Sequence, residues 1–296
     1  MICITGAGGT VGSEIVNRLE TAQTPFRVAH FSMEKVLASR KRGLEAVFLD
    51  YNRPDTLCEA FRGCDRLFLL GPNTLNQTHL EINAVEAAKS VDVQHIVKQS
   101  VMGAEGESYS LAKVHRPVEK AIASSDVAWT FLRPNSFMQN VITFMGETIK
   151  ADSTFYSAAS EARISHVDVR DIAAVAVKAL TDPNHAGKTY TLTGPEALSY
   201  DEVANELSKA LGRPIRHINL SPSDLKHGML SEGMPEALAD RMIDLDRYFR
   251  EDQASRITND IKHVTERDPR RFSQYMQDCA SLLQNDNLNH INVSEE

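Results

Sequence analysis

The sequence is poor in the features that define several classes of protein. Its 296 residues include four cysteines and one tryptophan, and the net charge is −8. The cysteines (Cys3, Cys58, Cys64 and Cys279) lack metal-ligand spacing, and a disulfide framework is not expected in a chain of this length. Because Asp and Glu outnumber Lys and Arg, the sequence disfavours nucleic acid or an anionic membrane as the main partner.

Three further signals are missing. No apolar run reaches membrane-spanning length, and no secretory pattern precedes the first apolar stretch, so we expect a cytoplasmic protein. No cluster of His, Cys or carboxylate residues has metal spacing, and no nucleophile elbow is present. The sequence therefore disfavours metal-assisted and acyl-transfer chemistry.

What the sequence does contain is a glycine-rich turn at its start. Residues 1–12 read MICITGAGGTVG, and a helical pattern follows. In such a turn Gly6 allows the sharp bend, Gly9 lets the backbone approach a diphosphate, and Gly12 lets the helix pack against the strand. The helix start then offers unpaired N–H groups to the phosphates. We expect dinucleotide contacts from Gly6, Gly8, Gly9, Thr10, Val11 and Gly12.

Alternating apolar runs and helical patterns continue as far as Leu132. This spacing predicts parallel βαβ units, and the expected fold class is α/β, a Rossmann-type doubly wound parallel sheet. After Arg133 the pattern becomes mostly helical, which predicts a smaller helical cap over the carboxyl ends of the strands, where ligands of such sheets bind. Asp171 is expected to cap a helix that begins at Ile172.

These patterns predict a division of the chain. Residues 1–133 and 164–194 would form the dinucleotide-binding Rossmann domain, and residues 134–163 and 195–284 the substrate or cap domain. Residues 285–296 are polar and poor in apolar side chains, so they are expected to form a loosely held tail.

Several motifs resemble the NmrA-like group of atypical short-chain dehydrogenases. They are Gly6–Gly12, Leu49-Asp50-Tyr51-Asn52, Leu132-Arg133-Pro134-Asn135 with Phe137-Met138 and Asn140, and His166–Ala173. The resemblance covers about residues 1–284, and it extends to triphenylmethane-dye and quinone reductases and to reductase-like synthases of ergot alkaloid pathways. It implies an NAD(P)H-dependent reductase, in a group that also includes members which bind the cofactor and only regulate.

Cofactor choice is expected to depend on the end of the second strand. There an acid selects NAD, whereas an Arg accepts the 2′-phosphate of NADP. This chain has neither: Phe31 could stack on adenine and Ser32 with Lys35 could hold a 2′-phosphate, or these are ordinary loop residues. The missing carboxylate favours NADP over NAD. Asp50 resembles the group's adenine-contacting acid, and its alternative role is to cap a helix.

A short-chain dehydrogenase needs a Tyr as proton donor, a Lys that lowers its pKa and a Ser that polarises the carbonyl. Tyr109 and Lys113 have the Tyr-x-x-x-Lys spacing that puts both on one helix face, and Ser100 ends the fifth strand. Pro117, however, favours a helix start near His115 and would leave Tyr109 in the preceding loop. Lys113 is the candidate cofactor contact, Tyr109 the candidate acid, and His115 is assigned no catalytic role.

The remaining candidates surround the expected nicotinamide. Further cofactor contacts are expected from Tyr51, Leu70, Gly71, Pro72, Ser100, Pro134, Asn135 and Phe137. Phe137, Met138 and Phe144 form an apolar helical face that either packs in the core or makes a wall for a flat aromatic substrate. His166 is either a core residue or a substrate contact.

Three functions remain open at this point. The leading hypothesis is an NAD(P)H-dependent reductase that delivers hydride to a planar, conjugated small molecule such as a quinone, enone or iminium. The alternatives are a non-catalytic NAD(P)-binding redox sensor and a tailoring enzyme of secondary metabolism. The expected partner is a small-molecule substrate, with no nucleic acid, membrane or metal; the oligomeric state is left open.

Overall fold

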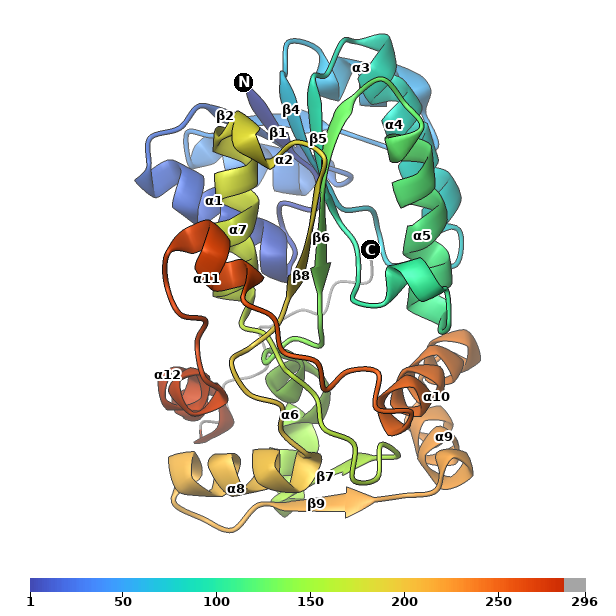
Figure 1. Ribbon diagram of the computed structural model, residues 1–296, viewed down its shortest axis with the longest axis vertical. Helices are drawn as coiled ribbons and strands as arrows, with labels where there is room; N and C mark the ends of the chain where they lie inside the picture. The colour runs from blue at the N-terminus through green and yellow to red at the C-terminus, as the bar shows by residue number, and fades with distance from the viewer. Residues whose placement is uncertain (285–296) are drawn as a thin grey trace.

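The computed structural model describes residues 1–284 and is built around a seven-stranded parallel sheet (Figure 1). The strands are β1 (Ile2–Ile4), β2 (Phe26–His30), β3 (Glu45–Phe48), β4 (Arg66–Leu69), β5 (His95–Gln99), β6 (Ala128–Pro134) and β8 (Lys188–Leu192). Their order is β3-β2-β1-β4-β5-β6-β8, and every pair is parallel. The direction of winding reverses between β1 and β4, so the predicted doubly wound fold is confirmed.

Helices cover both faces of this sheet (Figure 1). One face carries α1 (Thr10–Thr21), α2 (Met33–Lys41), α7 (Val169–Thr181) and α11 (Asp260–Thr265). The other carries α3 (Pro54–Phe61), α4 (Gln77–Ser90) and α5 (Ser110–Ala123). In β1, Ile2 and Ile4 belong to the first hydrophobic cluster and Cys3 to the second. Because successive side chains of a strand point to opposite faces, a strand buried on both sides is apolar throughout.

The remaining elements form a third hydrophobic cluster at the carboxyl edge of the sheet. They are α6 (Asn140–Asp152), β7 (Thr154–Ser157), α8 (Tyr200–Leu211), β9 (Arg216–Asn219), α9 (Pro222–Ser231), α10 (Glu236–Arg250) and α12 (Phe272–Gln284). β7 and β9 pair in parallel as a separate two-stranded sheet. We call these elements the cap. The predicted domain boundaries stay a prediction, and the predicted tail lies outside the described residues.

The predicted start of α7 is wrong by three residues. The helix begins at Val169, and its N-cap is Asp168, whose carboxylate accepts a hydrogen bond from the backbone N–H of Arg170 at 2.8 Å. Asp171 instead lies inside the first turn and accepts from the backbone N–H of Arg270 at 2.7 Å. Both aspartates can serve a helix start, and the extended backbone of Asp168 decides which one is the cap.

The predicted start of α5 is also wrong, because the helix begins at Ser110 rather than near His115. Pro117 lies in the helix interior and forgoes one backbone hydrogen bond. The preceding Tyr109 offers no side-chain cap, but Asp244 of α10 accepts a hydrogen bond from the N–H of Ser110 at 2.6 Å. A tertiary contact therefore extends the helix beyond the limit that Pro117 predicted.

Candidate functional site

The glycine turn has the geometry of a phosphate cradle. Gly6 has a φ of +62°, and a Cβ on Gly12 would lie 2.0 Å from the carbonyl oxygen of Gly6, so a side chain at Gly12 cannot fit. α1 starts after Gly9, which provides no side-chain cap, and Gly8 and Gly9 are exposed. The first N–H groups of α1 thus face outward at the switch point of the sheet. These residues fit the diphosphate of a dinucleotide.

The segment after β4 lies directly beside this cradle. A Cβ on Gly6 would be 3.3 Å from the carbonyl oxygen of Leu70, and the hydroxyl of Tyr51 donates to the same oxygen at 2.9 Å. The Tyr51 hydroxyl therefore holds the carbonyl group of Leu70 in place beside the glycine turn. Asp50 accepts a hydrogen bond from the backbone N–H of Asn52 at 2.9 Å, which is a local turn.

The end of β2 supplies an open aromatic face and a cation. Phe31 is 54% exposed, with its ring centroid 6.1 Å from that of Phe48. Ser32 is the N-cap of α2. The Cδ atom of Lys35 lies 3.9 Å from the position of a Cβ on Gly8, so the Lys35 side chain passes beside the glycine turn. An exposed aromatic ring and a cation therefore follow β2, with the cation beside the glycine turn.

Tyr109 and Lys113 do not share a helix face. Tyr109 precedes α5; its buried hydroxyl donates to the carbonyl oxygen of Met102 at 2.7 Å, and its ring stacks on Tyr248 at 4.2 Å. Burial raises the pKa of the Tyr109 phenol well above its usual range. The Lys113 side chain is exposed, whereas Ser100 is buried and its hydroxyl has no hydrogen-bond partner within residues 1–284. The structure therefore places the three predicted catalytic side chains in different surroundings.

His115, and not Lys113, points inward from α5. Two residues along a helix turn the side chain by about 200°, so His115 faces the sheet where Lys113 faces solvent. The Nδ1 atom of His115 lies 3.2 Å from the Nζ of Lys98 on β5.

Lys98 and Glu81 form a fully buried ion pair that sequence reasoning missed. Both side chains are 0% exposed, and their Nζ and Oε1 atoms are 2.9 Å apart. Oε1 of Glu81 also accepts from the N–H of Gly71 at 2.7 Å, so the pair is joined to the segment after β4. The available signal was a charged residue within the predicted strand His95–Gln99, because charges are almost never fully buried unless they are paired.

The predicted apolar helical face is wrong, because α6 begins at Asn140 and both Phe137 and Met138 precede it. Met138 is fully buried in the third cluster, Phe137 is partly buried with its backbone paired to Val167, and Phe144 is 55% exposed. His166 is buried, and neither ring nitrogen has a hydrogen-bond partner within residues 1–284.

Pro134 and Asn135 connect the end of β6 to neighbouring segments. The side-chain amide of Asn135 donates to Ser165 Oγ and to the carbonyl oxygen of Ala254, both at 2.8 Å. The carbonyl oxygen of Pro134 accepts from the N–H of Met102 at 2.9 Å. Both residues are buried, and these contacts fix the backbone between the sheet and the cap.

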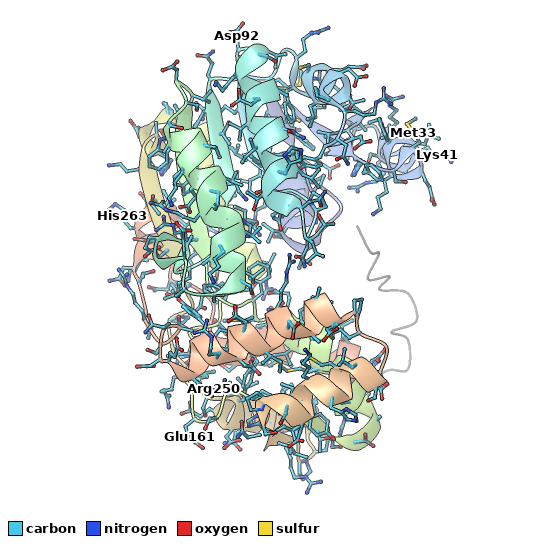
Figure 2. All side chains as sticks on the ribbon, turned by 90° about the vertical axis from the view of Figure 1, so that its right-hand side faces the viewer. Met33, Lys41, Asp92, Glu161, Arg250 and His263 are labelled. Carbon is cyan, nitrogen blue, oxygen red and sulfur yellow. The ribbon has the colours of Figure 1, made fainter. Side chains whose placement is uncertain are left out.

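α10 fastens the cap to the sheet on the side of α5, across whose end it runs (Figure 2). Arg241 donates to Asn73 Oδ1 at 3.0 Å and to the carbonyl oxygen of Thr74 at 3.2 Å, in the loop that follows β4. Arg247 donates to the carbonyl oxygen of Ser108 at 2.7 Å. The cap thereby contacts the two loops that border the carboxyl ends of β4 and β5.

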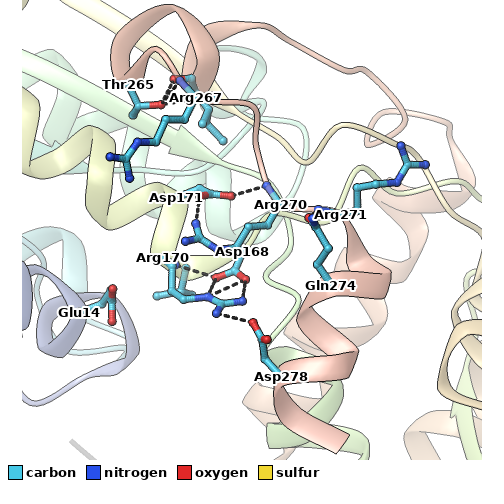
Figure 3. A network of polar contacts seen from close by, with 12 residues as sticks. Glu14, Asp168, Arg170, Asp171, Thr265, Arg267, Arg270, Arg271, Gln274 and Asp278 are labelled. Atoms are coloured by element: carbon cyan, nitrogen blue, oxygen red, sulfur yellow. Dashed lines mark hydrogen bonds and ion pairs between the residues drawn. The ribbon is translucent and has the colours of Figure 1, made fainter. Parts of the chain in front are cut away.

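A network at the start of α7 fastens the cap on the opposite face (Figure 3). Arg170 bridges the buried Asp168 of the sheet domain and Asp278 of α12, each at 2.6 Å. Arg270 pairs with Asp171 in the same network. The cap is therefore held by hydrogen bonds from α10 on one side of the carboxyl edge and by ion pairs at the start of α7 on the other.

A Ser–His–Asp hydrogen-bonded chain lies elsewhere, within the cap. The Oγ of Ser157 is 2.8 Å from Nε2 of His217, whose Nδ1 is 2.8 Å from Asp201. The Asp201 side chain is 66% exposed, whereas Ser157 is only 3% exposed. Nucleophilic catalysis needs the opposite arrangement, an accessible serine and a shielded acid. We therefore interpret the hydrogen bonds among Ser157, His217 and Asp201 as structural contacts within the cap.

Two kinds of feature are absent from the described part of the chain. Residues 1–284 contain no helix long and apolar enough to cross a membrane. The same residues contain no group of three or more His, Cys, Asp or Glu side chains that could hold a metal ion.

The fold and the glycine cradle define an NAD(P)-binding oxidoreductase of the Rossmann class, and comparison with known proteins agrees. A family model described as "NmrA-like family" matches residues 1–276, and the chain belongs to that family. An NAD(P)H azoreductase of Xenophilus azovorans is 36% identical over 284 residues, which cover 96% of this chain and 99% of the relative. An agroclavine dehydrogenase of Claviceps fusiformis is 31% identical over 287 residues, 95% of this chain and 98% of the relative.

A solved structure shows the same architecture. The NADPH-dependent quinone oxidoreductase of Escherichia coli, crystallised with NADPH, superposes with a TM-score of 0.88 at 25% identity. The match covers 95% of this chain and 100% of that chain. The resemblance to the NmrA-like group that the sequence motifs predicted is thus confirmed.

Proposed function

We propose that this protein is an NAD(P)H-dependent reductase that transfers hydride to a planar, conjugated small molecule such as a quinone, enone or iminium. The observation that carries the proposal is the open glycine cradle at the switch point, with the cap fastened over the same edge. When bound, the reduced nicotinamide supplies the hydride. The chain supplies the phosphate cradle, the shielding cap and the polar groups beneath it.

Support for the substrate class comes from the relatives. They are named as an azoreductase, an agroclavine dehydrogenase and a quinone oxidoreductase, and the chain spans nearly their whole length. Phe137, which is only partly buried, remains a proposed contact for a flat ligand. Lys35 beside the glycine turn, together with the absence of a carboxylate at residues 30–32, favours NADPH over NADH.

The predicted site residues divide into two sets within this proposal. The glycine turn, Phe31, Ser32 and the segment Leu70–Pro72 border the cradle and remain proposed cofactor contacts. Tyr109 is better explained as a packing residue, because its hydroxyl is already used and buried. The proton that accompanies hydride transfer then has to come from another group.

The test is a titration with NADPH and NADH followed by turnover. We expect nicotinamide fluorescence to change on binding, with NADPH binding more tightly. We also expect NADPH oxidation with at least one of a panel of quinones, enones, iminium compounds and dyes. A protein that binds neither nucleotide would refute the proposal, and binding without turnover on the whole panel would refute its catalytic part.

A further inference from the structure

The ammonium group of Lys98 fixes the proton positions of a buried polar cluster. Its Nζ contacts three acceptors: Glu81 Oε1 at 2.9 Å, the carbonyl oxygen of Gln99, and His115 Nδ1 at 3.2 Å. An ammonium has three donors and no lone pair, so each N–H has one acceptor. Nδ1 of His115 must therefore accept, and the ring proton of a neutral imidazole then lies on Nε2.

The cluster lies near the carboxyl ends of the strands, where ligands of this fold bind. Lys98 lies near the carboxyl end of β5, Glu81 is hydrogen-bonded to Gly71 after β4, and His115 is on α5. From the cap, Arg241 of α10 is close enough to act electrostatically on His115. All four belong to the edge between the sheet and α10.

The outer nitrogen of His115 is available to a ligand. Within residues 1–284 Nε2 of His115 has no hydrogen-bond partner, and it is not fully enclosed, whereas both ring nitrogens of His166 are. Burial lowers the pKa of His115 well below its usual value, and the nearby charges of Lys98 and Arg241 lower it further. The ring is therefore neutral at pH 7, with an N–H directed away from Lys98.

Resting on the proposed reductase function, we propose that His115 donates its Nε2 proton to the substrate atom that gains electrons when hydride is transferred. The hydride forms a bond to the electrophilic atom of the substrate, and the displaced π pair moves to the conjugated oxygen or nitrogen. That atom takes the Nε2 proton, and the N–H electron pair stays on the imidazole.

Lys98 completes the proton transfer from the other side of the ring. As Nε2 loses its proton, Nδ1 takes one from the Lys98 ammonium, so the imidazole stays neutral and Lys98 becomes an amine. Water then protonates Nε2, and Nδ1 returns its proton to Lys98. The carboxylate of Glu81, 2.9 Å away, favours the charged form of Lys98 between turnovers and is a positioning residue.

The inference is tested with two acceptors that differ in their need for a proton. A quinone takes a hydride and a proton, whereas a cationic triphenylmethane dye is neutralised by hydride alone. We expect His115→Phe to lower kcat for the quinone roughly 100-fold, the range of general acid catalysis, and kcat for the dye by less than about threefold. The solvent deuterium isotope effect should appear only with the quinone and disappear in this variant.

A matched control is His263→Phe, which makes the same substitution at an exposed position of α11. It should leave both reactions unchanged, and both variants should keep the NADPH affinity of the parent. An equal loss with both acceptors, or no loss with the quinone, would overturn the inference.

A second measurement does not depend on turnover. In the nucleotide-free protein, ¹⁵N NMR should find the His115 ring proton on Nε2. A proton on Nδ1 would overturn the inference while leaving the reductase proposal standing. If the parent protein binds no nucleotide, the proposed function fails first and the proton donor fails with it.

Discussion

The carboxylate of Asp244 accepts a hydrogen bond from the backbone N–H of Ser110 at a distance of 2.6 Å, although 134 residues separate them in the chain. Asp244 belongs to α10 of the cap, and Ser110 is the first residue of α5. The N-cap of α5 is thus supplied by another part of the molecule. This bond joins the cap to the start of the helix that carries His115.

Asp244→Ala should destabilise the protein by about 1 kcal/mol, the usual cost of losing a helix cap. The measurement is the free energy of unfolding from urea denaturation. Asp240→Ala on the same helix removes only a surface pairing with Lys226 and should cost less than about 0.5 kcal/mol. Equal costs for the two variants would show that Asp244 is not a cap.

Gly12→Ala should abolish nucleotide binding, because the new Cβ would lie 2.0 Å from the carbonyl oxygen of Gly6 and force the cradle open. Nicotinamide fluorescence during an NADPH titration measures the effect, with circular dichroism as a check on folding. Gly228→Ala is the control, since a Cβ there meets no atom within 4 Å. A Gly12→Ala protein with the parent's affinity would contradict the proposed cradle.

Lys98→Met should destabilise the protein by about 3–5 kcal/mol, because it leaves the Glu81 carboxylate buried without its partner. The double variant Lys98→Met/Glu81→Leu should recover most of this loss, since an apolar pair fills the same space without a buried charge. Urea denaturation of both variants gives the comparison. A double variant no more stable than the single one would mean that packing, not charge, decides the cost.

Lys35→Ala should weaken NADPH binding roughly tenfold, as expected for the loss of a charged contact to phosphate, and leave NADH binding unchanged. The reason is the position of Lys35 beside Gly8 in the glycine turn. Parallel fluorescence titrations with the two nucleotides measure the ratio. If both affinities fall by the same factor, Lys35 does not contact the 2′-phosphate.

Stability should fall as the pH drops from about 6.5 towards 4. Burial lowers the pKa of His166 to about 4, and burial with nearby Arg66 lowers that of His95 to about 4. The unfolded chain binds a proton at each histidine near pH 6.5, whereas the folded chain does not, so protonation favours unfolding.

The loss should reach roughly 3 kcal/mol for His166 by pH 4. His166→Phe keeps an aromatic ring between Tyr200 and Phe272 and should reduce the slope of the free energy of unfolding against pH by one proton. An unchanged slope would show that His166 is not buried in its neutral form.

Local patterns in the sequence were sufficient to predict the sheet. The apolar runs and the glycine turn are local properties, because the side-chain period of a strand and the conformational freedom of Gly6 depend on neighbouring residues only. The cap also contains two short strands, β7 and β9. Their pairing with each other, which joins residues about sixty positions apart, has no local signal.

The candidate catalytic side chains could not be predicted from local patterns in the same way. The Tyr-x-x-x-Lys spacing pointed to Tyr109 and Lys113, but Tyr109 precedes α5, and the packed helix buries His115 and exposes Lys113. The sequence by itself determined the fold class, the family and the phosphate cradle, because each is encoded in contiguous residues. Only the tertiary structure decided which charges are buried together, since Glu81, Lys98 and His115 meet through the packing of three separate elements.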